Sequence, residues 1–178
     1  CQRPLELGAD LVCESMTKAI GWFGTDIGGA VIGPRARYHD LILFRKDFGG
    51  ALSPKSAWPP LVYGLPTLAT RMVNYQKSDM HVAQFLEAHP KVERVYYPGL
   101  ASFPQHDLAR RQMVDDHSEF APGSMIYFVI RDDEHSGKPA ARMIDWAAKN
   151  AYTLTLAVSL GQIKTLIEAP YSMTHAAM

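Results

Sequence analysis

The chain has 178 residues, of which 47% are hydrophobic and 20% are charged, a composition that supports a substantial core beneath a hydrated surface. Lys plus Arg and Asp plus Glu both number 18, so the formal net charge is zero, and no basic run exceeds two residues. Nucleic acid is not an expected partner, because binding it requires a basic face.

The cysteine content and the hydropathy also limit the class of protein. Cys1 and Cys13 are too few to make a disulfide framework, which favours a reducing, cytoplasmic location. The first residues lack the basic and apolar regions of a signal peptide. No stretch approaches the roughly 18 uninterrupted apolar residues of a membrane span, so we expect no membrane association.

The first half of the chain predicts two short strands followed by helices. Residues 9–14 form an apolar run that predicts a buried strand, with Cys13 in the core, and 28–33 predict a second strand bounded by glycines. A helix is expected over 35–48. The four prolines within 53–66 argue against one continuous helix there. Helical spacing of apolar residues over 67–88 predicts a long amphipathic helix that connects two subdomains.

The second half alternates between strands and helices. Strands are expected at 92–97, 125–130 and 152–158, and helices at 105–113 and 139–150. This order is typical of a small α/β domain. The abrupt start and the lack of a closing helix signal suggest that the chain is a piece of a longer protein.

Common catalytic and metal-binding patterns are absent from the sequence. None of the seven histidines forms an i, i+4 pair or lies near a cysteine with zinc-type spacing, so no metal site is expected. Neither the G-x-S-x-G nucleophile elbow nor the G-x-x-x-x-G-K-[ST] phosphate loop occurs. Hydrolase and nucleotide-binding functions therefore lose their usual signals.

Lys18 is the strongest candidate for chemistry. It follows a predicted buried strand, comes after the hydroxyls of Ser15 and Thr17, and precedes a glycine-rich stretch. Hydroxyls so close to an amine can bind a phosphate group while the amine attacks a carbonyl, provided that burial lowers the amine's affinity for its proton. The spacing alone equally fits a solvent-facing lysine in a Ser/Thr turn.

Longer motifs resolve this ambiguity. The stretch CQRPLELGADLV-x-x-S-x-T-K closely resembles the cofactor-lysine segment of the pyridoxal-phosphate enzymes of Cys/Met metabolism, the trans-sulfuration family. Later blocks of that family resemble this chain in the same order, namely GALSPKSAW, GLPTLATRM, HPKVERVYYPGLASFPQH and AVSLGQIKTLIEAPYSMTH. The resemblance spans nearly the whole chain.

The resemblance implies a fold, a cofactor and site residues. The fold would be the α/β fold of type-I pyridoxal-phosphate enzymes, usually homotetramers built from tight dimers. Lys18 would hold pyridoxal 5'-phosphate covalently and carry protons, while Ser15 and Thr17 would bind its phosphate. Ser159 would lie near the carboxylate of an amino-acid substrate.

It also implies a division of the chain. Residues 1–66 would be the C-terminal part of the cofactor-binding large domain, 67–90 a connecting helix, and 91–178 most of the small C-terminal α/β domain. The cofactor-stacking ring, the aspartate that pairs with the pyridine nitrogen and the phosphate-binding Tyr and Arg are expected upstream. The arginine that grips the substrate carboxylate is expected downstream.

The activity implied is that of a carbon–sulfur lyase. The segment YPGLASFPQ leans toward methionine gamma-lyase, which releases a thiol, ammonia and 2-oxobutyrate. Cystathionine gamma- or beta-lyase and O-acetylhomoserine sulfhydrylase remain alternatives, as does a truncated, non-catalytic paralogue that acts as an interaction module.

Several residues depart from the family pattern. Ala19 stands where an aromatic residue is usual, and Trp22-Phe23 replaces a glycine-histidine pattern. Glu14 brings a carboxylate next to Ser15, which would repel a phosphate unless it points away. Tyr63 and Pro66 replace residues that are commonly basic. These departures bear on substrate selectivity and efficiency.

Overall fold

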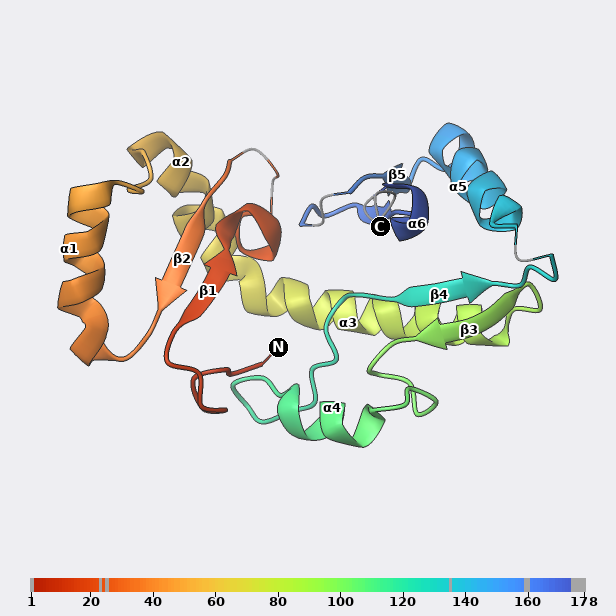
Figure 1. The fold of residues 1–178 in the computed structure, drawn as a ribbon, viewed down its shortest axis with the longest axis horizontal. Coiled ribbons are helices and arrows are strands. Elements are labelled where there is room, and N and C mark those ends of the chain that lie inside the picture. The colour runs from red at the N-terminus through yellow and green to blue at the C-terminus, as the bar shows by residue number, and fades with distance from the viewer. Residues whose placement is uncertain (1, 23, 25, 135, 159–160, 174–178) are drawn as a thin grey trace. The chain divides into compact units, whose positions relative to one another are not determined.

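The computed structural model describes residues 2–22, 24, 26–134, 136–158 and 161–173. The chain divides into two compact units (Figure 1). One contains residues 3–69 and 161–163, and the other contains 1–2, 70–160 and 164–178. Because the arrangement of the two units is not determined, each is described by itself.

The first unit is built on a hairpin-like pair of strands. Strand β1 (Val12–Ser15) pairs antiparallel with β2 (Gly29–Ile32), with Val12 opposite Ile32 and Ser15 opposite Gly29. Both strands lie within the predicted segments or one residue beyond them. The prediction of a buried strand with Cys13 in the core is wrong, since Cys13 is exposed in this structure. The reason is that β1 pairs with a single neighbour and little of the described chain covers its faces.

Helices follow the strand pair. A short turn, η2 (Arg35–Arg37), leads into α1 (Tyr38–Phe48), as predicted. Ser53 begins α2 (Pro54–Pro59), because its side chain accepts a hydrogen bond from the Ser56 amide at 3.1 Å.

The segment 53–66 is not one continuous helix, as predicted. Helix α2 is followed without a gap by the wider turn η3 (Pro60–Gly64) and then by α3 (Leu65–Ala88). Pro54 and Pro60 each stand at the start of their element, where a missing N–H removes no bond within that element. The helical geometry therefore changes twice in this segment, although the chain stays wound.

The second unit packs α3 against a strand pair. Strand β3 (Val92–Tyr96) pairs antiparallel with β4 (Tyr127–Ile130), with an irregularity between Val92 and Arg94. Helix α3 runs beside this pair (Figure 1). Ala83 of α3 is fully buried, in a core with Val92, Val95, Tyr97 and Leu100.

The remaining elements complete an α/β order. Helix α4 (His106–Gln112) follows β3, and α5 (Lys138–Asn150) contacts β5 (Leu154–Leu156). Strand β5 pairs parallel with β6 (Thr165–Ile167), and α6 (Pro170–Met173) follows. The sequence analysis did not identify β6 or α6. Among the described residues, no helix is long and apolar enough to cross a membrane.

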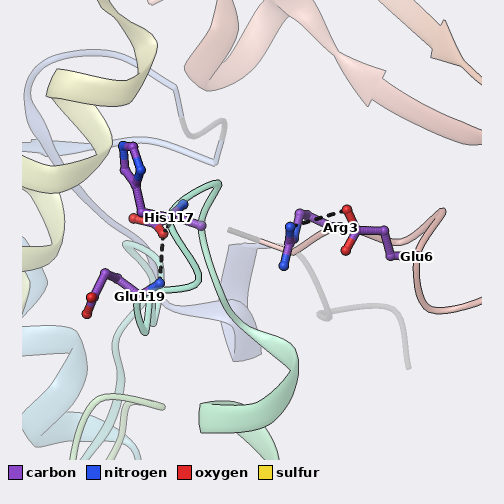
Figure 2. Close-up of polar contacts among 5 residues, drawn as sticks. Arg3, Glu6, His117 and Glu119 are labelled. Atoms are coloured by element: carbon purple, nitrogen blue, oxygen red, sulfur yellow. Dashed lines mark hydrogen bonds and ion pairs between the residues drawn. The ribbon is translucent and has the colours of Figure 1, made fainter.

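Local polar contacts shape the turns. The Asp115 carboxylate accepts hydrogen bonds from the amides of His117 and Glu119, both at 2.9 Å, and so closes the turn after α4 (Figure 2). In the other unit, Arg3 forms an exposed ion pair with Glu6 at 3.2 Å (Figure 2). An exposed pair of this kind contributes little stability.

Two polar groups, the Tyr97 hydroxyl and the Asp79 carboxylate, are buried or partly buried in the second unit. The Tyr97 hydroxyl donates to the Gly123 carbonyl at 3.0 Å, and burial together with the Asp79 charge raises the pKa of Tyr97 to about 12. One carboxylate oxygen of Asp79 is buried without a hydrogen-bond partner in the described structure. Burial raises the pKa of Asp79 from 3.8 to about 6.

This raised pKa predicts a pH-dependent stability. The folded state binds the Asp79 proton more tightly than the unfolded state, so stability falls as the pH rises from 3.8 to about 6 and is level above that. Asp79→Asn should therefore match the parent near pH 4 and exceed it at pH 8 by about 1 kcal/mol, less than full linkage because solvent screens a half-exposed group. Denaturant unfolding of the full chain at both pH values measures this.

Asp145→Asn is the matched control, since Asp145 is exposed on α5. It should leave the difference between the two pH values unchanged. An Asp79→Asn variant with the same pH dependence as the parent would contradict the assignment.

Candidate active site around Lys18

Lys18 lies in a wound segment directly after β1. The segment η1 (Met16–Ile20) leaves the strand at Ser15, and its helical path is broken at Lys18, where φ is −90° and ψ is −131°. The Lys18 side chain is half-buried. The lysine is therefore held in a turn at a strand end and not within a regular helix.

The turn is joined to the start of β2 through Gly28. The Gly28 amide donates to Thr17 Oγ1 at 3.0 Å, and the Gly28 carbonyl accepts from the Met16 amide at 2.9 Å. The Thr17 hydroxyl lies 3.4 Å from the same carbonyl. That contact is at the long limit of a hydrogen bond, so a stronger acceptor can compete for the hydroxyl proton.

Ser15 and Glu14 lie on opposite faces of β1. Ser15 is the last residue of the strand and is exposed. Successive side chains of a strand point to opposite faces, so Glu14 points away from the face that presents Ser15. The expected repulsion between the Glu14 carboxylate and a phosphate bound at Ser15 is thereby reduced.

Gly161 brings a distant segment against the turn. A Cβ atom at Gly161 would lie 2.4 Å from Lys18 Cα and 2.7 Å from its carbonyl carbon. Its φ of +129° is also one that side-chain-bearing residues rarely adopt. Only glycine fits at this position, because two backbone segments meet there and leave no room for a Cβ atom.

Gly64 also allows two backbone segments to approach closely. A Cβ atom at Gly64 would lie 2.0 Å from the Ile20 carbonyl oxygen. The last residue of η3 thus contacts the end of η1 directly through backbone atoms.

Trp22 closes the turn in an unfavourable backbone conformation. Its φ is +67°, in the left-handed region that costs a residue with a side chain about 1–2 kcal/mol. Its amide donates to the Lys18 carbonyl at 3.0 Å. Phe23, the other half of this departure from the family pattern, lies outside the described residues.

A small hollow lies beside the lysine. Its walls come from η1, from the segment that leads into β2, and from the helices after α1, and they include Thr17, Gly28, Ser56 and Pro60. Lys18 is not part of these walls. In the described ranges, no group of three or more His, Cys, Asp or Glu side chains could hold a metal ion.

The structure brings three of the predicted site residues together. Ser15, Thr17 and Lys18 lie together because they are neighbours in the chain at the end of β1. Ser159 lies outside the described residues, so its role near the substrate stays a prediction. None of Gly28, Gly64 and Gly161 was predicted as a site residue. Gly64 and Gly161 lie inside the matched blocks GLPTLATRM and AVSLGQIKTLIEAPYSMTH, whereas Gly28 lies outside every matched block.

The comparisons with known proteins identify the family. The model of the Cys/Met metabolism PLP-dependent enzyme family matches residues 1–178. The chain belongs to this family.

Individual relatives fall into several activities. The chain is 42% identical over 176 residues to an L-methionine gamma-lyase of Porphyromonas gingivalis, covering 98% of this chain and 41% of that protein. It is 39% identical over 178 residues to a cystathionine beta-lyase of Coxiella burnetii, covering 99% and 43%. It is 40% identical over 175 residues to an O-succinylhomoserine sulfhydrylase of Pseudomonas aeruginosa, covering 98% and 40%. The chain thus spans about two-fifths of the length of these relatives.

A solved structure shows the same fold. Cystathionine gamma synthase from Xanthomonas oryzae pv. oryzae, in complex with aminoacrylate and cysteine, matches with a TM-score of 0.82 and 36% identity, over 99% of this chain and 42% of that one. The mixed α/β fold predicted from the sequence is therefore that of a pyridoxal-phosphate enzyme.

The chemical groups of the turn are of the types that bind pyridoxal phosphate. Lys18 supplies a half-buried primary amine, and Ser15 supplies an exposed hydroxyl beside it. Thr17 supplies a hydroxyl with a weakly held proton. Gly161 lacks the Cβ atom that would collide with the Lys18 backbone, so the lysine can keep this position. When bound, the cofactor acts as an electron sink, and the protein contributes orientation and proton transfer.

The Gly64 contact leads to a prediction about stability. Gly64→Ala should destabilise the full chain by about 1–3 kcal/mol, because the new methyl group must displace the Ile20 backbone. Gly29→Ala is the matched control, since its Cβ would lie an ordinary 3.7 Å from the Glu14 carbonyl oxygen. Denaturant unfolding compares the two, and equal midpoints would show that η3 does not brace η1.

Proposed function

We propose that this chain carries the cofactor lysine of a carbon–sulfur lyase that acts on sulfur amino acids. The observation that carries the proposal is the placement of Lys18, half-buried in a turn that hydrogen bonds to Gly28 and contacts Gly161 through the backbone. A lysine in such a turn has little freedom to swing into solvent, which is what covalent attachment at a fixed position requires.

The chain's own residues have distinct tasks in this proposal. The Ser15 and Thr17 hydroxyls hold the cofactor phosphate. The Lys18 amine holds the cofactor before the substrate binds, then removes the substrate's α proton and returns a proton later in the cycle. Ser159 contributes to binding the substrate carboxylate.

The specific reaction proposed is a methionine gamma-lyase-like α,γ-elimination that gives a thiol, ammonia and 2-oxobutyrate. Its support is the similarity to the lyase of Porphyromonas gingivalis together with the segment YPGLASFPQ. Cystathionine gamma- or beta-lyase and sulfhydrylase activities are the alternatives, supported by relatives of comparable identity. A non-catalytic interaction module is the alternative of another class, supported by the departures at Ala19 and Trp22.

The domain organisation belongs to the same proposal. Residues 1–66 form part of a large cofactor-binding domain, 67–90 connect, and 91–178 form most of a small C-terminal domain. The length of α3 (Leu65–Ala88) and the change of compact unit between Ala69 and Thr70 support this division.

Assembly and location complete the proposal. We expect a homotetramer in the cytoplasm, a location supported by the free, exposed thiol of Cys13. Light scattering of the full chain after size-exclusion chromatography tests the assembly.

Covalent trapping tests the role of Lys18. Borohydride treatment of the full chain with pyridoxal phosphate should fix a phosphopyridoxyl group on Lys18, detected by peptide mass, and abolish its visible absorbance band. Lys18→Ala should lose the labelled peptide and at least about 10³-fold of activity, because the residue that carries the proton is removed. Labelling of another lysine with equal yield would overturn the assignment.

Parallel product assays test the reaction. Release of a 2-oxo acid is measured with methionine, cystathionine and O-acetylhomoserine, as 2-oxobutyrate from γ-elimination or pyruvate from β-elimination. It should be fastest, by kcat/KM, with methionine. A faster reaction with cystathionine, or a replacement reaction when sulfide is added to O-acetylhomoserine, would select the corresponding alternative. Absence of both labelling and turnover would favour the interaction module.

A further inference from the structure

We propose that Gly161 and Gln162 form a clasp that positions Lys18, a role that rests on Lys18 being the cofactor lysine of the proposed function. The two residues are more than 130 positions from Lys18 in the chain, yet residues 161–163 belong to the same compact unit as residues 3–69. Their contacts therefore lie inside one unit.

The first half of the clasp is the backbone of Gly161. Its Cα faces the backbone of Lys18 so closely that a Cβ would lie 2.4 Å from Lys18 Cα and 3.2 Å from Lys18 Cβ. Contact at Cα and Cβ limits where the lysine side chain begins and therefore which directions its amine can reach.

The second half is the side chain of Gln162. Its Nε2 atom would lie 2.7 Å from a Cβ at Gly24, and its Cγ atom 3.2 Å. Gly24 has a φ of +66° and follows the turn that carries Lys18. Gln162 thus covers the far end of the same turn.

The contacts of Gly161 and Gln162 add to the hydrogen bonds that Gly28 makes with the same turn. The Gly28 amide and carbonyl bind Thr17 and Met16, which precede Lys18. Gly161 contacts Lys18 itself, and Gln162 lies against Gly24. Three contacts at successive points leave the turn little room to shift, and a shift of about 1 Å at a reacting group costs about a hundredfold in rate.

Glycine-to-alanine variants separate this contact from backbone strain. Gly50 is the matched control, because its φ of +93° also disfavours a side chain but a Cβ there would meet nothing within 4 Å. Both Gly161→Ala and Gly50→Ala therefore carry backbone strain, and Gly161→Ala alone displaces Lys18. Gln162→Ala is a milder second variant that keeps the fold, and its control is Gln105→Ala, on an exposed residue with no side-chain cap bond.

The first measurement uses the full chain without cofactor. Amide hydrogen exchange over residues 16–22 should be about tenfold faster in Gly161→Ala than in the parent, with a smaller increase in Gln162→Ala, since a loss of about 1.4 kcal/mol in local stability is tenfold in exchange. Gly50→Ala and Gln105→Ala should leave this segment unchanged. Equal exchange in Gly161→Ala and Gly50→Ala would overturn the clasp.

The second measurement uses the full chain with pyridoxal phosphate. The pH midpoint of its visible band and the rate of borohydride trapping at Lys18 should both change in Gly161→Ala and stay within twofold of the parent in Gly50→Ala. If the parent itself shows no label at Lys18, the proposed function fails, and the exchange measurement still decides whether the clasp exists. An unchanged midpoint and trapping rate in Gly161→Ala, in a parent that is labelled, would show that the contact does not position the amine.

Discussion

The turn that carries Lys18 depends on its hydrogen bonds to Gly28. A chain segment directly after a strand would ordinarily continue as a flexible, solvent-exposed loop. Here the Gly28 carbonyl accepts from the Met16 amide, and the Gly28 amide donates to the Thr17 hydroxyl. These bonds turn the chain back over the start of β2, so that the position of the amine follows from the pairing of β1 with β2.

Close backbone approach is the second constraint, and it explains why glycine occurs where it does. Gly64 and Gly161 each bring another segment within contact of η1, at Ile20 and at Lys18. A methyl group at either position would meet backbone atoms, which cannot rotate away as a side chain can. Trp22 shows the opposite case, a bulky residue kept in a left-handed conformation that its surroundings must impose.

The second unit packs around a hydrophobic core and contains a partly buried carboxylate, Asp79, whose ionisation lowers stability. Its core joins Ala83 of α3 to Val92, Val95 and Tyr97, and the Tyr97 hydroxyl is satisfied by the Gly123 carbonyl. Asp79 is a partly buried carboxylate whose pKa is raised by burial, and its charge, together with burial, raises the pKa of Tyr97. The contribution of Asp79 to stability is therefore most favourable at low pH, where its carboxyl group keeps its proton.

Sequence reasoning located most strands and helices, because helical spacing over 67–88 and apolar runs such as 125–130 are local signals that survive in the fold. It also identified the family, and it predicted Lys18, Ser15 and Thr17 as site residues, since both depend on residue type and order along the chain. It misjudged the burial of Cys13 and missed β6, because burial and pairing depend on what lies opposite. Only the tertiary structure decided the roles of Gly64 and Gly161, because each depends on the distance to a backbone segment that is remote in sequence, and no local pattern records that distance. The hydrogen bonds of Gly28 likewise depend on the pairing of β1 with β2.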